Sequence, residues 1–145
     1  MTLLALGLLA LQGTIMLVDE FHFHRARGLP RWERIGHPLD TLSVLACYAV
    51  ALALPATRPA LIGYAALAAF SCLFITKDEF VHARECQPAE HFLHALLFVL
   101  HPLVLGSAAW LWYAGNRALL WGQAGLTLGF LGYQVAYWNF SRATR

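Results

Sequence analysis

The residues able to do acid–base or metal chemistry are confined to two short stretches of the chain. All eight carboxylates and all seven histidines of the 145 residues lie within 19–40 or 78–101. Carboxylates and imidazoles together are ligands of iron and zinc in proteins. The sequence therefore predicts that any chemistry takes place where these two stretches come together.

Four Glu/His pairs occur in these stretches at helical spacing. The pairs are Glu20 with His24, Glu33 with His37, Glu79 with His82, and Glu90 with His94. Residues three or four positions apart share one helix face, so each pair can direct a carboxylate and an imidazole to one place. Four-helix proteins with two metal ions use Glu from two helices and Glu-x-x-His from two others, the pattern of residues 79–82. We therefore predict two metal ions, iron favoured over zinc, held by these eight residues.

Five further polar residues are expected close to these ligands. They could act as additional ligands or as hydrogen-bond partners of ligands: Asp40, His91, His101, Asp78 and His22. Ion pairing in water at the surface of the protein is the simpler alternative role, and the sequence favours it for four residues. Those four are Asp19, His22, Asp78 and Glu85.

His101 and Cys86 each allow two interpretations. Pro102 cannot donate a helical hydrogen bond, which frees the carbonyl of Phe98. His101 could either bond that carbonyl or contribute to the metal site. Cys86 lies next to the predicted ligands and could be a ligand or a reactive thiol.

The rest of the chain has the composition of a protein that lives in lipid. Apolar residues make up 59% of it and charged residues 12%, about half the roughly 25% charged residues of soluble domains. A soluble protein this small could not bury so many apolar side chains. The net charge is only +2 and no basic tract is present, so nucleic-acid binding is not expected.

Five apolar segments are long enough, or nearly so, to cross a bilayer as helices. They span about 2–18, 39–54, 60–76, 91–113 and 118–138. Gly36 and Pro38 are expected to end the helix before the second segment, which places Glu33 on a separate short helix. Four glycines of the last segment are expected to pack closely against the bundle, and Tyr137 and Trp138 to anchor its end at the membrane surface. The glycines are Gly122, Gly125, Gly129 and Gly132.

The two polar stretches are approximate copies of one another. Each begins with Asp-Glu-Phe, at 19–21 and 78–80, and each ends with His-Pro-Leu, at 37–39 and 101–103. We predict an all-α integral membrane protein with about five transmembrane helices in a single domain, residues 1–145. Two helix-loop-helix repeats, about 2–54 and 60–113, would form a four-helix bundle, with a fifth helix at about 118–138.

The arginines and lysines predict how the chain is oriented. With five spans, one side of the membrane carries eight of the ten basic residues, and the other side carries Arg58 and Arg117. The eight are Arg25, Arg27, Arg31, Arg34, Lys77, Arg84, Arg142 and Arg145. Positive residues favour the cytoplasmic side, so we expect a multi-pass cell-membrane protein with its N-terminus outside. Its C-terminus and metal site would face the cytoplasm, and its first segment, which lacks a basic start, would be a span rather than a signal peptide.

These features favour a di-iron oxidoreductase, similar to hydroxylases and desaturases, acting on a lipid-like or hydrophobic substrate. Residues 90–94, Glu-His-x-x-His, look like part of a histidine box of membrane desaturases and hydroxylases, but the chain lacks their His-x-x-His-His motif. One alternative is a zinc-dependent membrane hydrolase. Another is a non-enzymatic metal-binding protein or an accessory subunit, acting as a homodimer or within a larger membrane complex.

Overall fold

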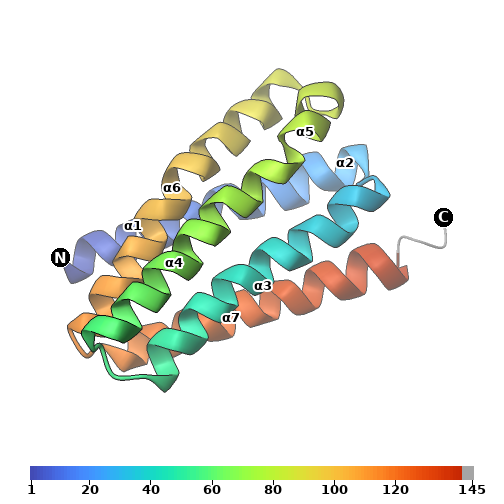
Figure 1. Ribbon diagram of the computed structural model, residues 1–145. Coiled ribbons are helices and arrows are strands. Elements are labelled where there is room, and N and C mark those ends of the chain that lie inside the picture. Colours follow the sequence, from blue (N-terminus) through green and yellow to red (C-terminus); the bar gives the residue numbers. More distant parts are fainter. Residues whose placement is uncertain (142–145) are drawn as a thin grey trace.

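The computed structural model describes residues 1–141, and these form a bundle of five long helical stretches without a strand (Figure 1). The prediction of an all-α chain is confirmed. The stretches are α1 (Thr2–Val18) with η1 (Asp19–His24) and α2 (Arg25–Arg27); α3 (Arg31–Ala53); α4 (Arg58–Phe74) with η2 (Ile75–Asp78) and α5 (Glu79–Glu85); α6 (Pro88–Tyr113); and α7 (Arg117–Ala136) with η3 (Tyr137–Ser141). Arg142 and Arg145, which entered the orientation argument, lie outside the described residues.

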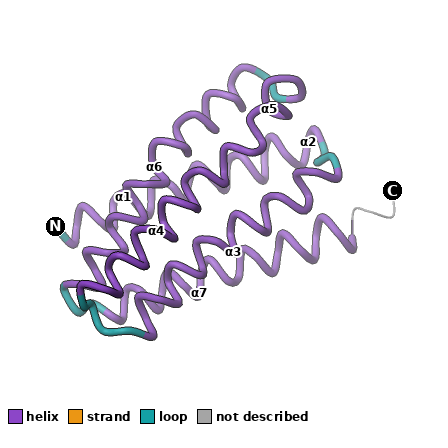
Figure 2. The backbone as a smooth tube through the Cα atoms, in the orientation of Figure 1, coloured by secondary structure: helices purple, strands orange, loops and turns teal. Residues whose placement is uncertain are grey.

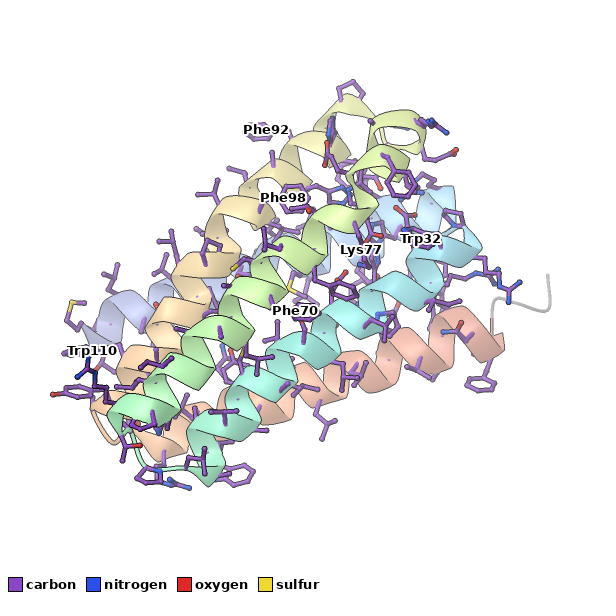
Figure 3. The ribbon with its side chains drawn as sticks, in the orientation of Figure 1. Trp32, Phe70, Lys77, Phe92, Phe98 and Trp110 are labelled. Atoms are coloured by element: carbon purple, nitrogen blue, oxygen red, sulfur yellow. The ribbon has the colours of Figure 1, made fainter. Side chains whose placement is uncertain are left out.

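Four of the five stretches are long and apolar enough to cross a membrane. They are Thr2–Arg27, Arg31–Ala53, Arg58–Glu85 and Pro88–Tyr113; helix α7 is not among them. Large apolar side chains cover much of the outside of the bundle, and Phe92 and Trp110 project from it (Figure 3). Such an exterior suits lipid better than water.

The helices run side by side, and the loops lie at the two ends of the bundle (Figure 2). Helix α1 packs along α6, and α3 packs against both α4 and α7. The apolar core includes Leu105 and Leu111 of α6 and Leu120 of α7, all of which are buried. Both polar stretches lie at one end, with η1, α2 and α5, while the N-terminus lies at the other end (Figure 1).

Helix α3 is continuous through Pro38, so the expected break before residue 39 is wrong. Proline leaves the carbonyl four residues earlier without its helical donor. That carbonyl belongs to Arg34, and the side-chain amide of Asn139 donates to it at 3.4 Å. Gly36 lies close to a neighbouring segment, since a Cβ there would be 3.1 Å from Cε of Lys77. The unbroken helix places Glu33 and His37 on one rigid face.

Two turns adjoining the apolar helices depart from α-helical geometry. Asp19–His24 form a π-helical turn, in which residues five apart come into line, and Ile75–Asp78 form a tighter 3₁₀ turn. The π-helical turn contains the first copy of Asp-Glu-Phe, at 19–21, and the 3₁₀ turn ends on the first residue of the second copy, at 78–80. The different winding gives the two matching aspartates different surroundings.

Candidate metal centre

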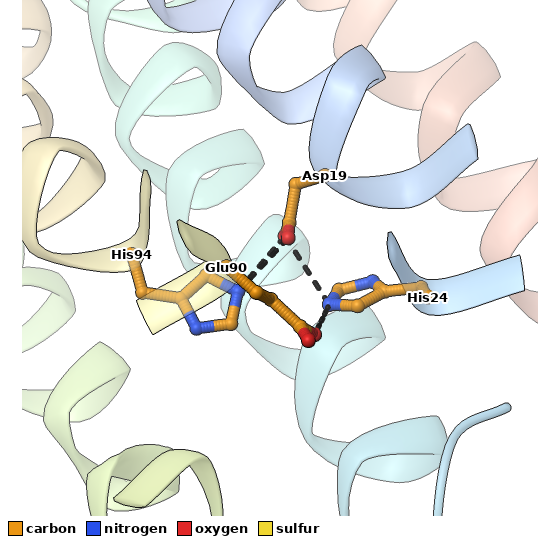
Figure 4. Close-up of side chains that lie close together, drawn as sticks. All are labelled: Asp19, His24, Glu90 and His94. Carbon is orange, nitrogen blue, oxygen red and sulfur yellow. Dashed lines mark hydrogen bonds and ion pairs between the residues drawn. The ribbon is translucent and has the colours of Figure 1, made fainter. Parts of the chain in front are cut away.

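Four buried side chains converge at the polar end of the bundle and form what we call group one. Its members are Asp19, His24, Glu90 and His94, and one ligand atom of each lies within 4.8 Å of the others. Nε2 of His94 lies 3.0 Å from Oδ2 of Asp19, and Nε2 of His24 lies 3.2 Å from the same oxygen (Figure 4). The distance from Nε2 of His24 to Oε1 of Glu90 is 3.7 Å.

A second cluster, group two, consists of Glu33, His37 and His82. Nε2 of His82 lies 3.2 Å from Oε1 of Glu33, whose side chain is fully buried. Glu33 belongs to α3 and His82 to α5, and both side chains are buried inside the bundle. Two imidazoles and one carboxylate match the ligand types of non-haem iron sites that keep open positions.

The two groups adjoin, because their four imidazole rings are neighbours. The ring centroids of His82 and His94 are 3.9 Å apart, and those of His24 and His37 are 5.0 Å apart. Each of these pairs joins a ring of group one to a ring of group two. The arrangement is one continuous centre with two ligand sets.

Arg27 links the two groups through their carboxylates. Its guanidinium donates to Oε2 of Glu33 at 2.9 Å and to Oε1 of Glu90 at 3.0 Å. Both carboxylates are almost completely buried, so without a nearby cation each would carry a large desolvation penalty. Arg27 supplies one positive charge for two negative ones, and the histidines or a metal ion must balance the rest.

Three imidazole nitrogens at the centre are buried and make no well-formed hydrogen bond among the described residues, although two of them lie 3.2 Å from carboxylate oxygens. They are Nε2 of His24 and both ring nitrogens of His82. Buried polar atoms rarely lack a well-formed hydrogen bond, so these nitrogens have bonding capacity that a metal ion could use. A metal ion with bonds of about 2.1 Å holds its ligand atoms about 3.0–3.4 Å apart, which matches the separations of 3.0 and 3.2 Å between Asp19 and the two histidines of group one. The residues thus fit a metal ion in donor type, spacing and unmet bonding capacity.

Glu20 lies beside group one but outside it, and it orients His24. Its Oε2 accepts a hydrogen bond from Nδ1 of His24 at 3.2 Å, which leaves Nε2 turned toward Asp19. Its Oε1 accepts from Trp138 at 2.7 Å and from the Tyr133 hydroxyl at 2.9 Å. Metal-binding histidines commonly donate their second N–H to such a carboxylate. Trp138 is 2% exposed, so the expectation that it is a surface anchor is wrong.

The remaining predicted ligand, Glu79, is also outside both groups. Its side chain is half-exposed and lies 2.7 Å from Nε2 of His91, which is exposed to a similar degree. The Glu79-x-x-His82 pair is therefore split: the histidine enters group two, and the carboxylate is 4.0 Å from its other nitrogen. Six of the eight predicted ligands are in the two groups, and Glu20 and Glu79 are not.

The five expected additional residues surround the centre without joining either group. Lys77 binds both Asp40 and Asp78, and Asp78 also accepts from the indole of Trp32 at 2.8 Å. His91 pairs with Glu79, and His22 is exposed beside Phe23. His101 bonds Ser71 at 2.9 Å rather than a metal group.

Asp19 is the ligand candidate that sequence reasoning missed. It was expected in a surface ion pair, yet it is buried between two histidines of group one. In an α-helix, a five-residue spacing places Asp19 and His24 on different faces, but the π-helical turn brings them into line. A search for Asp and His five apart would have found the pair, although nothing in the sequence marks the π turn.

The two predicted repeats contribute corresponding residues crosswise. Each group takes a histidine from the first helical stretch of one unit and a Glu/His pair from the second stretch of the other unit. The corresponding contacts are His24 to Glu90 at 3.7 Å with His82 to Glu33 at 3.2 Å, and Asp19 to His94 at 3.0 Å with Asp78 to His37 at 4.0 Å. Lys77 and Trp32 hold Asp78, so group two has one carboxylate fewer.

Cys86 lies at the edge of the centre, with Sγ 3.9 Å from Nδ1 of His94. Burial, with a smaller effect of the negative charge of Glu90, raises the pKa of the Cys86 thiol to about 12. The side chain is therefore a neutral thiol at physiological pH, which is a poor nucleophile. A reactive thiol at Cys86 is therefore not favoured by its surroundings.

A cavity of about 1090 Å³ leads to the centre through the apolar part of the bundle. Residues of α1, α3, α6 and α7 line it, from Leu6 and Leu119 at one end to His24, His37 and His94 at the other. Leu6 and Glu20 both border it, so the cavity follows roughly 21 Å of the first helix. Its size is that of a small-molecule site.

The glycines of α7 shape this cavity instead of packing against a neighbouring helix. No atom lies within 4 Å of the Cβ position at any of the four glycines, so the expected close packing is wrong for the described residues. Gly122, Gly125 and Gly129 line the cavity. The missing side chains leave room along the whole of this helix face.

No family model, no curated protein and no solved structure matches this chain. The fold and the site therefore define its class by themselves. It is an all-helical bundle with four helices apolar enough to cross a membrane and with buried His/carboxylate groups that could hold a metal ion.

Proposed function

We propose that this protein is an integral membrane oxidoreductase with two metal ions, which acts on a lipid-like or hydrophobic substrate. The observation that carries the proposal is that residues of groups one and two line one end of an apolar cavity. The groups would supply the metal chemistry, and the cavity would bring an apolar molecule to it.

The proposed location is the cell membrane, with the polar end of the bundle at the cytoplasmic face. Four apolar stretches and an apolar exterior support insertion, with α7 as a shorter fifth span. The polar end carries Arg25, Arg27, Arg31, Arg34, Lys77 and Arg84, which supports the orientation. The N-terminus would then lie outside.

Asp19, His24, Glu90 and His94 would hold one metal ion, and Glu33, His37 and His82 the other. The adjacent imidazoles of the two groups support a pair of ions rather than two distant sites. Iron is favoured because both groups mix imidazoles with carboxylates, and group two has the ligand set of oxygen-activating non-haem iron. When bound, such ions supply one-electron and oxygen chemistry.

The protein's own residues would perform the remaining tasks. Glu20 would keep Nε2 of His24 turned toward the metal, and Arg27 would keep Glu33 and Glu90 charged in a buried site. The apolar walls would align a hydrocarbon chain and exclude water from the reacting end. A zinc-dependent hydrolase remains the second candidate, because group one alone offers four possible ligands, which is the number that zinc commonly takes.

Metal analysis of the purified protein, with an absorption spectrum before and after reduction, tests this function. Two irons per chain and a visible spectrum that changes on reduction would support the oxidoreductase. Zinc without such a spectrum would favour the hydrolase. A metal-free protein that keeps its fold after chelation would contradict both and would point to an accessory role.

A further inference from the structure

The two metal groups differ at the aspartate that begins each copy of Asp-Glu-Phe. Asp19 is a member of group one, and its Oδ2 lies 3.0 Å from Nε2 of His94 (Figure 4). The matching residue of the second copy is Asp78, which lies outside group two with its Oδ2 4.0 Å from Nε2 of His37. Group one therefore offers four possible ligands, and group two offers three.

Asp78 is held by hydrogen bonds to two side chains that belong to neither group. Nζ of Lys77 donates to its Oδ2 at 2.8 Å, and the indole of Trp32 donates to its Oδ1 at 2.8 Å. Lys77 is itself fixed, because it also donates to both oxygens of Asp40 at 2.7 Å. The carboxylate of Asp78 is buried, so it depends on these donors for its hydrogen bonds.

A single sequence difference between the two copies accounts for this contrast. The residue before the aspartate is Val18 in the first copy and Lys77 in the second. Valine cannot bind a carboxylate, and the ion-pair partners of Asp19 within residues 1–141 are the two histidines of group one. A lysine ammonium has three donors. The second copy thus contains both the carboxylate of a fourth ligand and the cation that withholds it.

The number of protein ligands decides whether a metal ion can bind anything else. Zinc sites with four protein ligands are closed and structural, whereas those with three keep a position for water or substrate. Two imidazoles and one carboxylate are the set that leaves open positions on non-haem iron. His37 and His82 of group two also border the apolar cavity, which gives a small molecule a route to such a position.

We propose that the metal ion of group two binds a small exogenous ligand, and that Lys77 keeps this ion open by holding Asp78. The ligand class is a small anion or a diatomic molecule such as dioxygen. The ion of group one, with its fourth ligand in place, is the closed one. Lys77 acts through Asp78 and is therefore a positioning residue. This inference rests on the proposed function, because it assigns the reactive ion of the same two-metal centre.

Azide binding to the full-length protein loaded with cobalt(II) tests this assignment. Azide is a small anion that occupies open metal positions, and the visible absorption of cobalt(II) changes with its coordination. The wild type is expected to hold two cobalt ions and to bind one azide per chain, because only group two is open. Cobalt content is measured in the same samples, so metal loading and azide binding are obtained separately.

Lys77→Met is expected to keep both cobalt ions and to lose the azide-dependent change, because the freed Asp78 completes group two. Lys77→Met with Asp78→Asn should recover that change, since an amide is a much weaker ligand than a carboxylate. Arg84→Met, at an exposed position of α5, is the control and should behave like the wild type. Where Lys77→Met does not fold, Lys77→Met with Asp40→Asn replaces it, because these substitutions remove the cation together with one of its two carboxylates.

Two bound cobalt ions with no azide, or with two azides per chain, would overturn the inference and leave the two-metal centre standing. An azide response that persists without Lys77, or that stays lost when Asp78→Asn is added, would also overturn it. A wild type that binds no cobalt would instead contradict the metal centre of the proposed function, and the inference with it.

Discussion

Nε2 of His94 lies 3.0 Å from Oδ2 of Asp19, although the two residues are 75 positions apart. One follows the first helix and the other lies in α6, so this contact joins the two halves of the chain. It is short enough for both atoms to bind one metal ion. The account of this protein as a two-metal membrane enzyme depends on contacts of this kind.

Removal of the Asp19 carboxylate should cost the protein one of its two metal ions. Asp19→Asn is expected to halve the metal bound per chain, because group one loses its shared oxygen. Asp78→Asn, at the matching position of the second repeat, is the control, since Asp78 is held by Lys77 and Trp32. Metal analysis of both purified variants checks this, and equal loss from the two would argue against group one.

Arg27→Gln should destabilise the metal-free protein more than the metal-loaded one. Without Arg27, the buried carboxylates of Glu33 and Glu90 lose their cation, which costs about 3 kcal/mol. Bound metal would replace that charge. Thermal unfolding with and without chelator measures both effects, and an equal shift under the two conditions would mean that metal does not bind these carboxylates.

Trp138→Phe should weaken metal binding without removing a ligand. The substitution takes one hydrogen bond from Glu20, which in turn orients His24. Losses of such supporting contacts lower metal affinity by about 10- to 100-fold. Competition with a coloured chelator gives the affinity, and Trp121→Phe, at an exposed tryptophan, is the control that should keep it. Unchanged affinity in Trp138→Phe would show that Glu20 has no part in holding His24.

Gly125→Leu should block the cavity while the metal stays bound. The added side chain meets no atom within 4 Å of its Cβ and projects from a helix that tolerates leucine. Gly63→Leu is the matched control, because Gly63 has the same free space but does not line the cavity. Binding of a fatty-alcohol probe and metal content are measured together. If Gly125→Leu still binds the probe like the control, the cavity is not the binding site.

Hydropathy and spacing were sufficient to predict five helical stretches and six of the seven side chains that gather in the two groups. Long apolar segments leave few alternatives to helices, and His24, Glu33, His37, His82, Glu90 and His94 follow from residue type and helix face. Sequence spacing shows which residues share a helix face, but it does not show which neighbouring helix that face contacts. Glu20 therefore turned toward Trp138, and Glu79 toward His91 at the surface.

Other features depend on contacts that sequence spacing does not contain. The π-helical turn that aligns Asp19 with His24 has no marker in the sequence. In the unbroken helix α3, the carbonyl of Arg34 that Pro38 leaves without a helical donor accepts from Asn139, which is far away along the chain. Nothing in the sequence distinguishes Arg27 from the other arginines of its loop, yet it joins the two groups.

The metal content of three proteins purified side by side tests the central claim most directly. They are the wild type, His24→Ala with His82→Ala, and His22→Ala with His91→Ala. The account predicts two metal ions in the wild type and in the third protein, whose substituted histidines lie outside both groups, and none in the second. The same metal content in all three, or its loss only from the third, would contradict it.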